Sequence, residues 1–156
     1  MNSKDIKVLN KVCENVDEYR WSVISPEDRY YSLIDYPVEA IRSGNVFLSE
    51  VKKGLIIVTG TYKIPFYYEE DNYTLEKKYF ASIMSDLHNS PSSIAFITNE
   101  DYGDMINNNN LLTFNFGKFG KTTQNNIIVD LYDYVNRNVN GVDDLYDDFL
   151  VDNEKE

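Results

Sequence analysis

Two apolar runs on either side of a short turn, within residues 46–61, constrain the fold of this chain most. Residues 46–51 are mainly apolar, residues 55–61 are rich in β-branched side chains, and Lys52-Lys53-Gly54 separates the two runs. Two such runs around a short turn with glycine predict a pair of antiparallel strands. Residues 62–68 continue the second strand, and Pro65 requires a sheet edge or a bulge. Residues 69–72, which are acidic and polar, predict a solvated turn.

Helical spacing predicts most of the other elements, because apolar side chains recur every three or four positions. The predicted helices are residues 3–19, residues 37–42 ended by Gly44, residues 75–87, a helix capped by Thr122 or Thr123 and ended by Asn140-Gly141, and a last helix from Val142. Short strands are expected at residues 94–98 and 112–116, with a polar loop at residues 99–110.

The element order α, ββ, α, ββ, α, α predicts the fold class α+β. A chain of 156 residues fits one domain, residues 1–156. We expect an antiparallel sheet of about four strands, with three to four helices packed mainly on one face. Residues 142–156 are expected to form an acidic C-terminal helix and tail.

Cys13 and His88 are the one cysteine and the one histidine, and these counts exclude several kinds of site. Neither a disulfide within the chain nor a zinc site of several Cys and His ligands can form. No cofactor is predicted. A lone thiol, a polar start without an apolar leader, and a longest apolar run of only residues 55–58 predict a cytoplasmic, reducing setting.

One motif shares the glycine-lysine-threonine ending of a phosphate-binding loop, at residues 117–122. That loop places phosphate on backbone N–H groups at a helix N-terminus. Asn115 stands where the pattern requires its first glycine, so a glycine turn before a helix with a threonine cap explains the segment better.

A second motif, from Asn136 to Asp147, follows the spacing of a calcium-binding loop, with Gly141 at the sharp turn. Asn136 replaces the first carboxylate, and Asp147 is shorter than the bidentate glutamate of such loops. The alternative is a helix that ends at Asn140-Gly141.

Glu50 and Lys52, two positions apart at a strand end, lie on one side of the strand. Metal-dependent nucleases use such a pair with a further acid, which Asp35 or Glu39 supplies in this hypothesis. A pairing of His88 with Asp86 or Cys13 is a further candidate. Packing explains it better, since Cys13 lies in an apolar helical stripe. His88 is expected in the last turn of the helix whose apolar stripe covers residues 75–87 and which Ser90-Pro91 ends.

The C-terminal segment carries the clearest amphipathic pattern. Its apolar side chains recur at helical spacing, and the opposite arc holds the predicted partner-binding residues Asp143, Asp144, Asp147 and Asp148. Residues 130–156 hold nine of the 26 acidic side chains and two of the 15 basic ones. An acidic face of this kind favours a basic partner surface. The alternative is a helix docked on the domain, with its acids merely solvated.

These features predict a small, acidic, non-enzymatic protein that binds or inhibits a protein with a basic, nucleic-acid-handling surface. Immunity proteins, antitoxins and phage or viral anti-defence proteins share this profile. With a formal net charge of −11, neither nucleic acid nor a membrane is an expected direct partner. The alternatives are a metal-dependent nuclease or hydrolase built on Glu50, and a viral structural or assembly protein that docks through its C-terminal helix.

Overall fold

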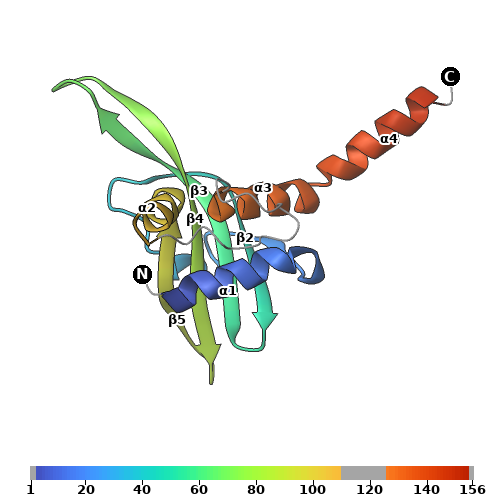
Figure 1. Cartoon of the computed structure of the whole chain (residues 1–156), viewed down its shortest axis with the longest axis horizontal. Helices are drawn as coiled ribbons and strands as arrows, with labels where there is room; N and C mark the ends of the chain where they lie inside the picture. The colour runs from blue at the N-terminus through green and yellow to red at the C-terminus, as the bar shows by residue number, and fades with distance from the viewer. Residues whose placement is uncertain (1–2, 110–125, 155–156) are drawn as a thin grey trace.

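A five-stranded antiparallel sheet forms the centre of the residues that the computed structural model describes, 3–109 and 126–154. Each strand pairs with the next along the chain, in the order β1-β2-β3-β4-β5 (Figure 1). The strands are β1 (Ser22–Ile24), β2 (Ile41–Lys52), β3 (Leu55–Tyr67), β4 (Tyr73–Leu87) and β5 (Ser90–Thr98). The helices are α1 (Ser3–Glu14), α2 (Asn99–Asn109), α3 (Ile127–Val139) and α4 (Val142–Glu154), with 3-10 turns at Val16–Glu18 and Tyr31–Leu33.

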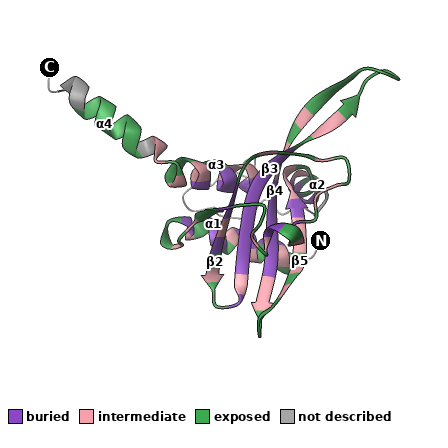
Figure 2. Ribbon diagram, turned by 180° about the vertical axis from the view of Figure 1, so that it is seen from behind, coloured by how far each residue is buried: buried purple, intermediate pink, exposed green. Residues whose placement is uncertain are grey.

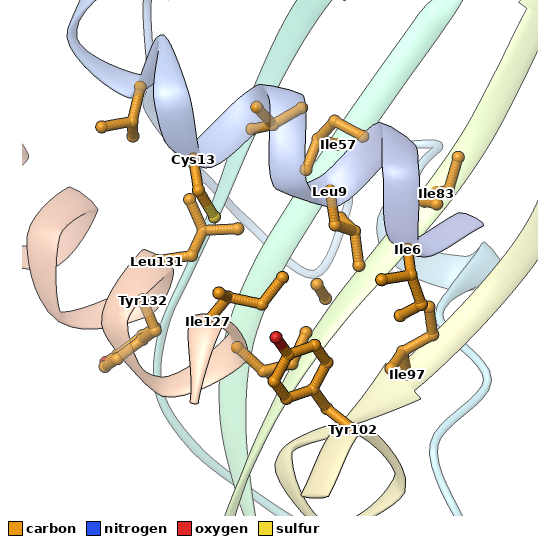
Figure 3. Close-up of a cluster of buried hydrophobic side chains, with 14 of the residues drawn as sticks. Ile6, Leu9, Cys13, Ile57, Ile83, Ile97, Tyr102, Ile127, Leu131 and Tyr132 are labelled. Carbon is orange, nitrogen blue, oxygen red and sulfur yellow. The ribbon is translucent and has the colours of Figure 1, made fainter. Parts of the chain in front are cut away.

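The helices α1, α2 and α3 cover one face of the sheet and enclose the larger core (Figure 3). Their buried side chains meet strand residues that point to the same face. From the helices come Ile6, Leu9, Cys13, Tyr102, Ile127 and Leu131, and from the strands Phe47, Ile57, Ala81, Ile83 and Ile97. Each large apolar side chain buried in this way contributes about 1.5–3 kcal/mol.

The connection from β1 to β2, residues 25–40, covers the opposite face. Tyr31 and Ile34 pack there with buried residues of β2, β3 and β4. An ion pair between Arg29 and Asp86, with 2.6 Å between Nη2 and Oδ2, ties this connection to β4, and the hydroxyl of Tyr30 donates to the same carboxylate. The central strands are therefore buried on both faces.

The strand pair predicted around Lys52-Lys53-Gly54 is confirmed as β2 and β3. Leu55 pairs with Lys52, and β3 continues to Tyr67 as expected. The α+β class, the antiparallel pairing, the helix that Asn140-Gly141 ends and the helix from Val142 are confirmed as well.

The prediction of a helix at residues 75–87 was wrong, because this segment is β4. Its apolar side chains fit a helical stripe by coincidence. In a strand with both faces buried, Phe80, Ala81, Ser82, Ile83 and Met84 are all buried in succession. Such strands read as continuous apolar runs without alternation. His88 consequently lies in a hairpin turn with a φ of 59°, and not at a helix end.

Residues 99–109 form helix α2 instead of the predicted polar loop. Thr98 and Asp101 make a reciprocal capping pair, in which Asp101 N donates to Thr98 Oγ1 at 3.0 Å and Thr98 N donates to Asp101 Oδ2 at 3.1 Å. Tyr102, Met105 and Ile106 then follow at helical spacing and are buried. The capping pattern and this spacing were the signals that the sequence offered.

Three smaller predictions also need correction. Residues 37–42 are no helix, since Ile41 already pairs with Lys63 in the sheet and Gly44, with a φ of +68°, accompanies a register shift in β2. The cap of α3 is Asn126, and not Thr122 or Thr123. The sheet has five strands, in the order α1, β1 to β5, α2, α3, α4. The predicted strand at residues 112–116 lies outside the described residues.

Candidate protein-binding surfaces

The predicted acidic residues lie on α4, which begins directly after the turn at Gly141. Gly141 has a φ of +71°, and the N–H of Leu145 donates to its carbonyl at 3.0 Å, which is the first bond of the new helix. Asp144, Asp147 and Asp148 are exposed. Their spacing of three and four positions places these carboxylates on one face. The side chain of Asp143 lies outside what the structure describes.

The apolar stripe of α4 is exposed as well, so the docked helix that the sequence allowed is not what forms. Leu145, Tyr146, Phe149, Leu150 and Val151 are 46–66% exposed. The helix extends away from the sheet, and its main contacts are with α3 (Figure 2). One of these contacts places the guanidinium of Arg137 5.7 Å from the ring centre of Tyr146. The sheet face that α4 would cover is already filled by α1, α2 and α3.

A second projection is the hairpin at the far end of β3 and β4, here called the arm (residues 64–76). Among the residues that the structure describes, its strands pair only with each other, from Ile64 opposite Glu76 to Tyr67 opposite Tyr73. The pairing of β2 with β3 ends at Lys63, and that of β5 with β4 ends at Phe80. The exposed apolar residues of the arm are Phe66, Tyr67, Tyr68, Tyr73 and Leu75.

Sequence reasoning missed the arm because it placed a helix at residues 75–87, which left residues 62–68 without a partner strand. The signal was present in the symmetry of the segment. Aromatic residues stand on both sides of the acidic turn at residues 69–72. Tyr67 and Tyr73 face each other there with ring centres 5.3 Å apart.

The side chains of Cys13, His88 and Asp86 are not brought together. Cys13 is fully buried in the helix-side core, where burial, followed by the charges of Asp130 and Glu14, raises the pKa of its thiol. The prediction that Cys13 packs as a small hydrophobic residue is confirmed. His88 is exposed in the turn between β4 and β5, and the carboxylate of Asp86 is engaged by Arg29 and Tyr30.

Glu50 and Lys52 are exposed near the turn between β2 and β3. Asp35 accepts a hydrogen bond from Ser93 Oγ of β5 at 3.0 Å, three strands away from β2, which corresponds to about 14 Å. Glu39 lies before Ile41, the opposite end of β2, which is about 30 Å along the strand from Glu50. Within residues 3–109 and 126–154, no cluster of three or more His, Cys, Asp or Glu side chains could hold a metal ion.

The residues that follow the spacing of a calcium-binding loop lie in two helices, α3 and α4, and in the turn between them. Asn136 and Asn138 lie in α3, and Asn136 Oδ1 accepts from Asn140 Nδ2 at 2.7 Å. A calcium loop requires irregular backbone at these positions, so the geometry carries no such site. The phosphate-loop motif at residues 117–122 lies outside the described residues.

An open cavity of about 260 Å³ lies beside the C-terminal end of α3. Its lining mixes apolar, aromatic and polar side chains, namely Val16, Asp17, Tyr19, Trp21, Tyr134, Asn138 and Val139. The indole N–H of Trp21 is engaged by the carbonyl of Val16 at 3.1 Å. The described lining holds one carboxylate, that of Asp17, and no histidine, lysine or arginine, so it offers no pair of acid and base side chains for catalysis.

Comparisons with protein-family models, with curated proteins and with solved structures find no match for this chain. None of the helices within the described ranges is both long enough and apolar enough to span a membrane.

Proposed function

We propose that this chain is a non-enzymatic protein that binds and inhibits a protein partner through α4. The observation that carries the proposal is a helix that stands clear of the domain with both its apolar stripe and its acidic side chains exposed. An amphipathic helix that is exposed in this way is suited to lie in an apolar groove of another protein. Contiguous exposed apolar surface marks interaction sites in soluble proteins.

The charge of α4 selects the kind of partner. Residues 142–154 contain six acidic and no basic side chains. They would steer the chain toward a surface rich in lysine and arginine and repel acidic ones. Basic surfaces of this kind are typical of proteins that handle nucleic acid, and the carboxylates would there take the places of phosphates.

Inhibition of a nucleic-acid-handling protein is the work of immunity proteins, antitoxins and phage or viral anti-defence proteins, and we place the chain in that functional group. A cytoplasmic setting suits this role, and the unpaired, buried thiol of Cys13 is compatible with it.

The test begins with isolation of the partner from cells that express the chain, followed by measurement of its affinity and of its inhibition. Changing Asp143, Asp144, Asp147 and Asp148 together to Asn is expected to weaken binding roughly 10–100-fold, because both steering and close charge pairs are lost. The matched control changes Glu18, Glu27, Glu39 and Glu50 to Gln, which removes the same charge from exposed positions of the body. Equal effects of the two variants would overturn the proposal.

A further inference from the structure

We infer that the arm and α4 bind one and the same partner, a protein whose apolar grooves are flanked by lysine and arginine side chains. This inference rests on the proposed function of α4 and adds a second contact to it. The arm and α4 leave the domain in diverging directions, and both views show them clear of the sheet and its helices (Figures 1 and 2).

The two projections have the same surface chemistry. Residues 64–76 contain four acidic and no basic side chains, and residues 142–154 contain six acidic and no basic ones. Together they account for ten of the 11 excess negative charges of the whole chain. Among the described residues, ten of the 15 exposed large hydrophobic side chains also lie on these two projections.

Helix α3 connects the bases of the two projections. At the base of the arm, Lys77 Nζ lies 4.9 Å from the ring centre of Tyr79 and 5.9 Å from that of Tyr132 in α3. From Tyr132, α3 runs to the turn at Gly141, where α4 begins, a distance of about 14 Å along the helix. One partner molecule can therefore reach both.

The size of a stable interface favours joint binding. Specific complexes commonly use about 20–30 residues on each side. The arm and α4 have 13 residues each, by their bounds, so only the two together reach that size. A hairpin of two strands is only marginally stable in water by itself. The arm extends beyond the other strands of the sheet, so a partner that covers it would add to its stability.

A second copy of the chain is disfavoured as the partner that binds the arm and α4. Contact between two arms, two α4 helices, or an arm and an α4 would bring acids against acids with no base on either segment. Like charges in contact cost free energy, whereas a basic groove neutralises them.

The experiment replaces Tyr67 of the arm or Tyr146 of α4 with a photo-crosslinking phenylalanine analogue. The full chain is expressed in the cells that naturally produce it, so that the partner is present. Both positions are expected to crosslink to the same protein, whereas Val38, which is fully exposed on the body, is not. Tyr67→Ser with Tyr73→Ser is then expected to weaken binding of that purified protein roughly 10–100-fold. Ile94→Ser, an exposed apolar residue of β5, is the control and is expected to leave binding unchanged.

The outcomes separate this inference from the proposed function. Crosslinking from Tyr146 alone, or an affinity that the arm variant leaves unchanged, overturns the joint surface and leaves the proposed function standing. Crosslinking from Tyr67 to a second copy of the chain, or to a different protein, also overturns it. Crosslinking from neither position contradicts both. An unchanged unfolding temperature of the arm variant shows that lost binding is not lost folding.

Discussion

At the scale of single residues, Asp130 in α3 has an unfavourable environment. Its Oδ2 atom is buried without a hydrogen-bond partner, and so is the hydroxyl of Tyr102. Burial, and secondarily the charge of Asp133, raises the pKa of the Asp130 carboxyl above its ordinary value of 3.8. The folded state therefore holds this proton more tightly than the unfolded state does. The resulting destabilisation is fully present above the raised pKa and is relieved as the pH falls through it.

Asp130→Asn is accordingly expected to raise the unfolding temperature at pH 7. The difference from the unmodified chain should shrink as the pH falls toward 3.8. Thermal unfolding followed by circular dichroism over this pH range measures both effects. Asp148→Asn on α4, where the carboxylate is exposed, serves as the control. An Asp130→Asn variant that is less stable at pH 7 would show that the carboxylate is well satisfied.

Residue-scale predictions from the sequence succeeded where one side chain decides the outcome. Cys13 was recognised as a packing residue because its neighbours at helical spacing are apolar, and the fold confirms this. His88 was misplaced because its conformation depends on the pairing of β4 with β5, which no feature of His88 itself reveals. The type of a residue predicts its surroundings best when the helix or strand that contains it has been predicted correctly.

At the scale of elements, the sequence predicted β2, β3, α3 and α4 and failed at β4 and α2. The pattern of β4 is ambiguous because burial on both faces removes the alternation that distinguishes strands from helices. The pattern of α2 is masked by its polar composition, although Thr98 and Asp101 carry a capping signal. The binding surfaces depended on the elements in the same way. The sequence predicted α4 and its acidic face, but it did not predict the arm, because the arm requires β4 to be a strand.

The start of α3 depends on one side chain. Asn126 Oδ1 accepts from the N–H groups of Ile128 at 3.1 Å and Val129 at 3.4 Å, and its Nδ2 donates to the carbonyl of Asn99 at 2.7 Å. Asn126→Ala is therefore expected to lower the free energy of unfolding by about 1–2 kcal/mol, measured by urea denaturation. Asn138→Ala, at an exposed position of the same helix, is the control. A loss no larger than that of the control would contradict this role.

Helix α4 should be the least stable helix of the free chain. Isolated helices shorter than about 12–15 residues are marginal in water, and Asp144 and Asp148 repel each other at four positions apart. Hydrogen exchange should show the amides of residues 145–151 exchanging at least about 100-fold faster than those of α1, which has similar length but a buried stripe. Equal protection of both helices would mean that something covers α4. Protection that grows with protein concentration would identify a second copy as the cover.

At the scale of the whole molecule, nearly all of the net charge lies on two segments that the fold holds away from its core. The acidity of α4 was readable from the sequence, because charge depends on composition alone. Its exposed apolar stripe was not, since docking depends on whether the sheet face is free, and α1, α2 and α3 already fill it. Acidity and exposure together, rather than acidity alone, support binding as the function.

The rate of association with the isolated partner, measured by stopped flow between about 20 and 500 mM salt, shows whether α4 meets a basic surface. Electrostatic steering by α4 predicts a rate that falls steeply as salt rises, because exposed charges are screened beyond about 10 Å at 0.1 M. The variant with Asn at positions 143, 144, 147 and 148 should start lower at low salt and lose most of this dependence, whereas the Glu18, Glu27, Glu39 and Glu50 control should retain it. A variant rate that falls with salt as steeply as that of the unmodified chain would contradict the proposal that α4 meets a basic surface.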